Sequence, residues 1–385
     1  MLFSVDAHTI GCHLTGNEVY IRNLLNEYDE LDPASEFLTY LAKARADLSV
    51  PRRFTKRWVS DNPFRRLGYD MPMSLRRDRP DLLHVQYTAP LACSVPIIVS
   101  VHDVSYLECP EYFTRARAIQ LRYTVKRTIR AAARILTPSE FSRNAIIRTY
   151  GVDGDRVVVV HNAVSSLFRP MQRETAVHWV RQNNRIPAPF ILTVGDLQPR
   201  KNHLGLIRAF EDLIRHHPHL PHHLVMVGKE TWFAHTVRRA AEKSAVADRM
   251  HFTGWVSDDD LRYFYGACDF FVFPSFYEGF GLPILEAMAC GRAVACSNTS
   301  AMPEVANASA VLFEPASPSE ITRAMADLLL DPQLRQRKER MGSHRAAQFT
   351  WARAARETLD VYYQVAGATR PVLAEKTSPI SVVRR

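Results

Sequence analysis

The stretch FPSFYEGFGLPILEAMACGRAV, residues 273–294, holds the most informative pattern in this sequence of 385 residues. An apolar run ends at Pro274, a turn with Gly279 and Gly281 follows, and an apolar helical pattern starts near Pro283. Proline at the start of a helix needs no amide hydrogen bond, and glycine lets the backbone approach a ligand closely. Unpaired N–H groups at such a helix start favour an anionic or hydroxyl-rich ligand. The stretch therefore predicts a strand, a ligand-binding turn and a helix.

Two glutamates flank this turn. Glu278 precedes it and Glu286 follows it in the helix, so the loop brings the two carboxylates near each other. A single such glutamate usually caps its own turn or complements the helix dipole. With EGFGLP between the two, we favour the interpretation that both contact one ligand.

Short apolar runs alternate with helical patterns along the whole chain, which predicts parallel strands covered by helices on both faces. The candidate strands of the first half are LFSVDA, FLTYLA, LLHVQY, PIIVSVHD, ARILTPS and RVVVVHNAV, and those of the second half are FILTVGD, HLVMVGK, MHFTGW, DFFVFPS, RAVACSN and AVLFEP. We therefore expect an α/β fold of two facing doubly wound domains, with ligands bound at the carboxyl ends of the strands. The predicted domains are residues 1–167 and 168–350, followed by a helix and a flexible tail over 369–385.

Composition narrows the class of protein. The chain is 46% hydrophobic and 23% charged, and no run approaches the roughly 20 apolar residues that span a bilayer. The first residues, MLFSVDAH, indicate a buried strand and not a secretory signal, so we expect a soluble cytoplasmic protein. The six cysteines have no CxxC spacing, which predicts reduced core thiols and neither a disulfide framework nor a zinc site.

The formal charge of +9 is concentrated between Pro51 and Arg79, where nine arginines and lysines face three aspartates. Such a run is most often a solvated loop, and the alternative is an anionic partner such as the phosphate headgroups of a membrane. Nucleic acid is not an expected partner, because no nucleic-acid-binding motif accompanies the charge.

Two further motifs follow predicted strands. In TVGDLQPRKNHLGLIRAF the strand ends at Gly195, and Arg200 and Lys201 precede the next helix, where two cations suit a diphosphate. In SVHDVSYLECPEYF the strand ends at His102 and Asp103. The alternatives are a solvated basic turn for the pair of cations and a packed or capping role for the histidine.

Together these motifs resemble the retaining glycosyltransferases of family four, which have the GT-B fold. The resemblance runs nearly end to end and implies that the C-terminal helix, residues 351–368, crosses back to complete the first domain. The E-x7-E pattern matches Glu278 and Glu286. The resemblance implies that Glu278 contacts the donor sugar and that Glu286 holds the donor ribose.

The resemblance also implies roles for other residues. The HDxxxxxxPE signature matches from His102 through Glu111, which places His102 at the donor sugar. Arg200 and Lys201 would hold the diphosphate and stabilise the charge that grows on it as the glycosidic bond breaks. Asp196 stands where the family often has a basic residue, so Arg200 serves as the main fork. The implied donor-binding positions are Gly16, Gly195, Gly228, Val256, Gly279, Phe280, Gly281 and Leu282, and at Gly16 the sequence TGNEVY departs from the commoner TGIGRY.

No metal or other cofactor is expected. Asp258, Asp259 and Asp260 match a DxD metal motif, but Ser257 before them predicts a helix N-cap with an acidic first turn. A cluster of five histidines between His216 and His223 is interleaved with prolines and predicts a solvated loop without metal geometry.

The expected function is retaining transfer of a hexose, mannose or glucose, from a nucleotide-diphosphate sugar to a glycan or lipid-linked acceptor. From the basic segment we also expect the protein to attach peripherally to the inner face of an anionic membrane. The alternatives are a catalytically silent sugar-nucleotide-binding protein and a phosphorylase or epimerase on the same fold. An oxidoreductase is the weakest option, because GxGxxG is absent.

Overall fold

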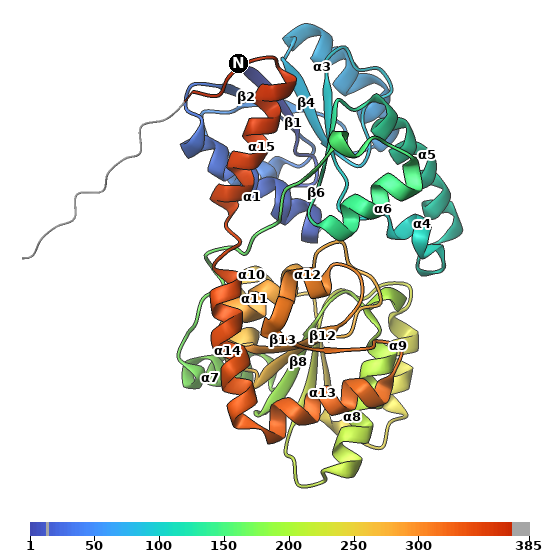
Figure 1. Ribbon diagram of the computed structural model, residues 1–385, viewed down its shortest axis with the longest axis vertical. Helices are drawn as coiled ribbons and strands as arrows, with labels where there is room; N and C mark the ends of the chain where they lie inside the picture. The colour runs from blue at the N-terminus through green and yellow to red at the C-terminus, as the bar shows by residue number, and fades with distance from the viewer. Residues whose placement is uncertain (13–14, 372–385) are drawn as a thin grey trace, which may run out of the picture. The chain divides into compact units, whose positions relative to one another are not determined.

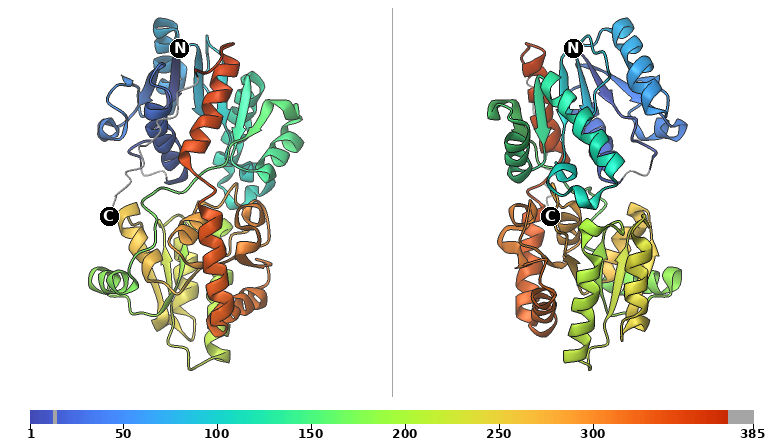
Figure 2. Two further views of the ribbon diagram at one scale, coloured as in Figure 1. Left: turned by 60° about the vertical axis from the view of Figure 1, so that its left-hand side comes forward. Right: turned by 90° about the vertical axis from the view of Figure 1, so that its right-hand side faces the viewer.

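The computed structural model describes residues 1–12 and 15–371 and shows two parallel sheets with helices on both faces (Figures 1 and 2). The first sheet has seven strands in the order β3-β2-β1-β4-β5-β6-β7, and the second has six in the order β10-β9-β8-β11-β12-β13. Every strand pair whose register is described is parallel. The predicted pair of doubly wound α/β sheets is therefore confirmed.

The first sheet and the layers that cover it are built by strands, helices and connecting turns. The strands are β1 Leu2–Asp6, β2 Glu36–Leu41, β3 Thr55–Trp58, β4 Leu82–Gln86, β5 Ile97–Ser100, β6 Arg134–Thr137 and β7 Val157–Val159. The α-helices are α1 Thr15–Leu31, α2 Pro63–Arg65, α3 Met71–Asp78, α4 Ser105–Glu108, α5 Arg115–Ala131 and α6 Glu140–Tyr150.

The second sheet repeats the plan. Its strands are β8 Phe190–Val194, β9 His223–Val227, β10 Met250–Gly254, β11 Phe270–Phe273, β12 Ala293–Ser297 and β13 Ala310–Phe313. Its helices are α7 Arg173–Asn184, α8 His203–His216, α9 Ala234–Glu242, α10 Asp258–Ala267, α11 Leu282–Ala289, α12 Met302–Ala306, α13 Pro318–Leu330 and α14 Pro332–Ala346, and the last helix is α15 Trp351–Val365. Short 3-10 turns join several of these elements.

By contacts the chain divides into two compact units. The first comprises residues 1–84 and 90–98 together with the chain from Ala355 to the end of the described residues, and the second comprises residues 85–89 and 99–354. The last strands of the first sheet thus belong to the same unit as the whole second sheet.

Alternating side chains of the second sheet build its core. Ile191, Leu224, Phe270 and Ala293 are buried in one cluster with side chains of α8, α9 and α13. Their neighbours point to the other face, because successive residues of a strand alternate. There the ring of Phe271 lies 5.6 Å from that of Tyr265 on α10.

The helix predicted near the C-terminus is present as α15 and packs in the first unit. The ring of Tyr362 lies 5.2 Å from that of Phe3 on β1, and its hydroxyl lies 2.5 Å from Nδ1 of His84. Tyr363 donates a hydrogen bond to Asp32. The end of the chain therefore completes the core around its first strand. The predicted tail over 369–385 lies mostly outside the described residues.

The basic segment between Pro51 and Arg79 is not the loop that its charge favoured. It contains β3, α2, a π-helical turn over Arg66–Asp70, and α3. Arg57 and Arg77 both form ion pairs with Asp78, and Arg66 is buried. Much of the charge is thus paired within the first unit, which explains how so basic a segment folds.

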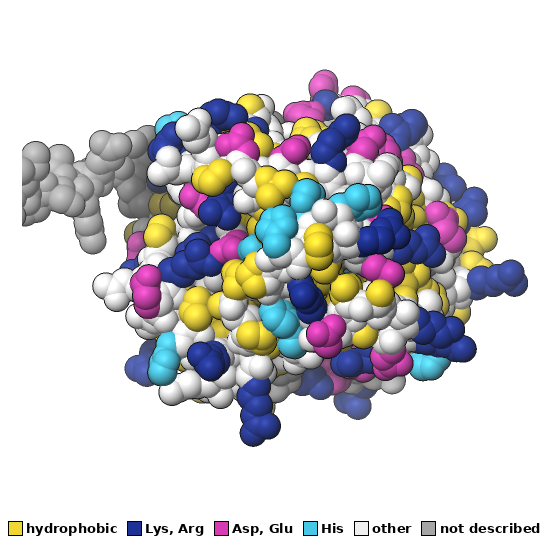
Figure 3. All heavy atoms as spheres, turned by 90° about the horizontal axis from the view of Figure 1, so that it is seen from below, with side chains coloured by type: hydrophobic (Ala, Val, Ile, Leu, Met, Phe, Trp, Pro, Cys, Tyr) yellow, Lys and Arg dark blue, Asp and Glu magenta, His cyan; other side chains and the backbone are white. Residues whose placement is uncertain are grey.

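The predicted loop of the histidine cluster is confirmed between α8 and β9, but the cluster is not wholly solvated. His216 ends α8 and His223 begins β9, while His222 is buried with its Nε2 at 2.7 Å from Asp269. Figure 3 shows histidine side chains gathered on one face of the molecule. The described residues include no group of His, Cys, Asp and Glu arranged to hold a metal ion.

Three further predictions concern the helix cap at Ser257, the cysteines and membrane-spanning helices. Ser257 accepts a hydrogen bond from the backbone of Asp260, so the predicted helix cap is confirmed. All six cysteines are free thiols, but only Cys268, Cys290 and Cys296 are buried. Within the described ranges, we find no helix with the length and apolar character that a bilayer crossing requires.

Candidate active site

The second unit brings the predicted turn and the predicted cations into direct contact. Glu278, which is 8% exposed, lies after β11, and Arg200 and Lys201 lie after β8. One carboxylate oxygen of Glu278 is 2.7 Å from Nζ of Lys201, and the other is 2.7 Å from Arg200. Because β8 and β11 are neighbours in the sheet, their carboxyl ends place these loops side by side.

Burial and charge set the protonation of this cluster. Burial alone would raise the pKa of Glu278, but the charges of Arg200 and Lys201 outweigh it and lower this pKa to about 2. Burial lowers the pKa of Lys201, although the charge of Glu278 opposes the effect. The pKa of Arg200 is raised, because Glu278 and Asp103 outweigh the effect of burial. The cluster is therefore a charged triad of one anion and two cations.

The loop with Arg200 and Lys201 is shaped by Asn202. Arg200 donates a hydrogen bond to the carbonyl of Tyr277, and Nζ of Lys201 lies 4.9 Å over the ring of Phe273. Asn202 has a positive φ of 54°, and its side chain accepts a hydrogen bond from N of Gly205 to start α8. One residue thus turns the chain and caps the helix behind the two cations.

Close approach explains the glycines at the ends of the central strands. A Cβ on Gly195 would lie 3.1 Å from the side chain of Lys201, and a Cβ on Gly228 would lie 2.1 Å from the carbonyl oxygen of Gly195. A side chain at Gly195 would therefore press on the side chain of Lys201, and one at Gly228 would collide with the backbone of Gly195. Val256, also predicted at the site, follows β10 and is half-buried.

The turn after Glu278 leaves its amides unused. Within the described ranges, the backbone N–H groups of Gly279, Phe280, Gly281 and Leu282 donate no hydrogen bond. Gly281 has a positive φ of 106° and occupies the N-cap of α11 without a side-chain cap. Free amides at a helix start form a site for phosphate or hydroxyl oxygens. The side chain of Phe280 is buried, so this residue offers only its backbone.

Gly279 joins the turn to the predicted histidine. A Cβ at this position would lie 2.0 Å from the carbonyl oxygen of His102, so only glycine fits. The carbonyl of Gly279 accepts hydrogen bonds from the hydroxyls of Ser139 and Ser142. The structure thus places the backbone of His102 against the predicted ligand-binding turn.

The side chain of His102 is held as a neutral imidazole. Its Nε2 lies 3.0 Å from Oε1 of Gln86, and the ring of Tyr87 packs edge-on against it. Burial lowers the pKa of His102 to about 4, although Asp103 opposes the effect. Asp103 itself accepts hydrogen bonds from N and Oγ of Ser105 at the start of α4, and Glu111 is exposed in the turn after α4.

Glu286 has a different hydrogen-bond partner from Glu278. Its carboxylate accepts a hydrogen bond of 2.8 Å from the hydroxyl of Tyr265. Burial raises the pKa of Glu286 to about 7, so it exchanges its proton near neutral pH. Tyr265 lies 21 residues away on α10, and nothing in its local sequence marks it as a site residue.

Other contacts were also missed. Gln86, the last residue of β4, contacts the ring of His102, and the hydroxyl of Ser300 accepts a hydrogen bond from the backbone N–H of Glu278. A polar residue at a strand end is the signal that points to Gln86, whereas Ser300 has none. Gly16, an implied donor-binding position, lies in the first turn of α1 in the first unit, so the sequence TGNEVY begins a helix.

Comparison with known proteins identifies the family of this chain. The family of group 1 glycosyl transferases matches residues 180–345, and glycosyltransferase family 4 matches residues 14–166. The chain is 32% identical over 265 residues to O-antigen chain mannosyltransferase B of Escherichia coli, which covers 69% of each chain. It is 30% identical over 257 residues to the serotype-specific mannosyltransferase WbdA of the same organism, covering 65% of this chain and 31% of that protein.

Solved structures agree on the fold. The structure of HepE from Anabaena in complex with UDP and glucose has a TM-score of 0.76 to this chain at 18% identity, with 94% of this chain and 100% of the other covered. Such a similarity confirms the GT-B architecture. The two family matches and the relative that is 32% identical show that this chain belongs to the group 1 glycosyltransferases of family four.

Proposed function

We propose that this glycosyltransferase moves a mannosyl residue from a nucleoside-diphosphate mannose to a hydroxyl of a glycan acceptor, with retention at the anomeric carbon. Two relatives are named mannosyltransferases, which supports mannose over the glucose that the sequence also allowed. The observation that carries the proposal is the triad of Glu278, Arg200 and Lys201 beside four unused amides.

The triad provides both a diphosphate site and a sugar site. In the free protein Glu278 forms ion pairs with both cations, and the cluster keeps a net charge of +1. A donor diphosphate has the charge to compete for Arg200 and Lys201, and the carboxylate then becomes available to accept hydrogen bonds from the donor sugar. Donor binding thus exchanges one anion for another, so the cations never lie unpaired in a buried place, where the cost would be high.

The same residues favour departure of the nucleotide. The acceptor oxygen forms a bond to the anomeric carbon while the bond from that carbon to the β-phosphate oxygen breaks, and the proton of the acceptor passes to a phosphate oxygen. Negative charge gathers on the leaving diphosphate, and fixed cations and amides stabilise it most in the transition state. His102 is neutral at pH 7 and so places no additional cation beside the sugar. We infer that no metal ion is needed, because Arg200 and Lys201 meet this charge.

Replacement of Lys201 tests the proposal. Lys201→Ala removes one of the two cations, so we expect turnover to fall by about 10²–10³, the usual loss for one stabilising donor. Transfer is measured from GDP-, UDP- and ADP-mannose with an oligomannose acceptor, in EDTA, and unfolding is followed in parallel. Donor without acceptor is included, because release of sugar from donor alone would indicate another reaction.

Lys243→Ala is the matched control, since Lys243 is exposed after α9 in the same unit. We expect it to leave turnover unchanged. Normal turnover of Lys201→Ala, or loss of all activity in EDTA, would contradict the assignment.

We further propose that the first unit attaches peripherally to an anionic membrane that carries the acceptor. Phe64 is 85% exposed and Tyr69 61%, near a hollow of about 400 Å³ lined by Trp58, Tyr69 and Met73. Arg76 is exposed on the helix that follows. Aromatic side chains beside cations favour the membrane interface.

Vesicle binding tests this attachment. We expect co-sedimentation with anionic phosphatidylglycerol vesicles but not with neutral ones, and Phe64→Ser should weaken it several-fold. Leu48→Ser is the control, because Leu48 is equally exposed at 93% but lies in another segment of the unit. Equal binding to neutral vesicles would contradict the proposal.

A further inference from the structure

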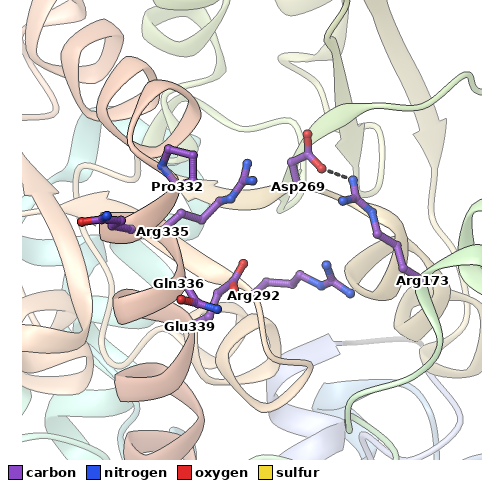
Figure 4. Close-up of a pocket in the computed structure, with 8 residues that line it drawn as sticks. Arg173, Asp269, Arg292, Pro332, Arg335, Gln336 and Glu339 are labelled. Carbon is purple, nitrogen blue, oxygen red and sulfur yellow. Dashed lines mark hydrogen bonds and ion pairs between the residues drawn. The ribbon is translucent and has the colours of Figure 1, made fainter.

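A polar cavity lies at the end of the second sheet opposite the donor loops. It measures about 440 Å³ and is lined by Arg173, Asp269, Arg292, Arg335, Gln336 and Glu339, among others (Figure 4). Asp269 directly precedes β11 and Arg292 directly precedes β12, so the cavity sits at the amino ends of the parallel strands. The triad follows carboxyl ends, and this cavity is therefore separate from the donor site.

Three arginines meet two carboxylates around this space. Arg173 is paired with Asp269, whose other oxygen lies 2.7 Å from Nε2 of His222. Arg292 donates to the carbonyls of Gly266 and Cys268. These contacts hold the guanidinium groups of Arg173 and Arg292 in place on one wall of the cavity. Among the described residues, the third guanidinium has no such partner.

That guanidinium belongs to Arg335. It is half-buried and extends toward the middle of the cavity in Figure 4, and within the described ranges it forms no hydrogen bond or ion pair. A guanidinium presents a planar fork of donors that matches phosphate in bidentate geometry. With two other guanidinium groups on the same cavity, the field favours an anion.

The remaining lining favours hydroxyl groups. Gln336 and Glu339 lie on the same helix as Arg335, α14, and their side chains also form no hydrogen bond or ion pair with any described residue. An amide and a carboxylate bind sugar hydroxyls well. No lining residue is aromatic, so a nucleotide base would find no ring to stack on, and an inorganic anion would leave most of the volume unfilled.

From this arrangement we propose that the cavity is a binding site for a phosphorylated sugar, with its phosphate on Arg335 and its hydroxyls on Gln336 and Glu339. The site is distinct from the donor site and does not depend on the proposed transfer reaction. It gives the enzyme a means of sensing a sugar phosphate through a surface that takes no part in the chemistry.

Calorimetric titration of the full chain with mannose 6-phosphate tests the site. We expect saturable binding that is at least tenfold tighter than that of inorganic phosphate or of mannose. Arg335→Gln should weaken it by about 10- to 100-fold, the range for a lost hydrogen bond to a charged group. Glu339→Gln should tighten it several-fold, because one negative charge leaves the cavity.

Two controls locate the ligand. Arg337→Gln removes the same charge from an exposed position of α14 outside the cavity and should change affinity by less than twofold. Lys201→Ala should leave binding intact, because the donor site is elsewhere. No saturable binding, an equal loss in both arginine variants, or a loss confined to Lys201→Ala would each overturn the proposal. None of these measurements involves sugar transfer.

Discussion

At the scale of single residues, the two glutamates of the E-x7-E pattern are set to opposite charge behaviour. Glu278 is bound by two cations, which hold its pKa at about 2. Glu286 is half-buried beside a neutral phenol, and its pKa lies at about 7. The first is therefore always ionised in the working range, whereas the second titrates within it.

This difference predicts that donor binding depends on pH through Glu286. A carboxylate accepts two hydrogen bonds from a ribose better than a carboxylic acid, so affinity for the nucleoside diphosphate should rise about five- to tenfold between pH 6 and pH 8. Stability moves the other way. The folded pKa exceeds the ordinary value of 4.5, so the contribution of this group falls as pH rises from about 4.5 to 7.

Calorimetry with the nucleoside diphosphate across this pH range checks the prediction. In Glu286→Gln the affinity should be lower and flat with pH. A pH dependence that persists in this variant would assign the titration to another group.

The residues of the triad could be predicted because each stands in a local motif at a strand end. Their partners could not. Tyr265 reaches Glu286 from another helix, and Gly279 is required because the carbonyl of His102 lies against it. Both facts depend on contacts between distant parts of the sequence, which a local pattern does not contain.

At the scale of elements, the turn before α8 holds the two cations proposed to bind the diphosphate. Its residue Asn202 supplies both the positive φ and the N-cap. Asn202→Ala should lower the free energy of unfolding by about 1–2 kcal/mol, because the cap is lost and alanine disfavours this conformation. Asn202→Gly should cost less, since glycine adopts the positive φ freely. Urea unfolding measures both.

The same pair of variants separates shape from charge. Because Arg200 and Lys201 lie on this turn, turnover should fall more in Asn202→Ala than in Asn202→Gly. Equal stability of the two variants would show that the backbone conformation contributes little.

Most elements could be predicted from apolar runs, and β3 shows where that method ends. Its residues, TKRW, are polar or charged in three positions of four, and they form a strand because β2 offers a free edge to pair with. The burial of His222 could not be predicted either, because its partner is distant in the sequence. His222 is buried by its bond to Asp269, which lies 47 residues away.

At the scale of the whole molecule, helix α15 packs against strands that lie far away in the sequence, 278 residues in the case of Tyr362 and His84. The ring of Tyr362 is fully buried against Phe3 and Tyr28. Tyr362→Ala should therefore lower the free energy of unfolding by about 3–5 kcal/mol, as for other large buried aromatic rings. Tyr69→Ala, where the ring is 61% exposed, should change it by less than about 0.5 kcal/mol. Thermal or urea unfolding measures both, and equal losses would contradict this account.

The packing of α15 also sets an order of events during synthesis. A ribosome releases the strand that holds Phe3 well before the helix that holds Tyr362, so the core of the first unit stays incomplete while the second unit is made. Nascent chains ordinarily fold from the amino terminus onward. Here the core around Phe3 closes only after α15 has been made, so a chain truncated before α15 would expose apolar side chains of this core.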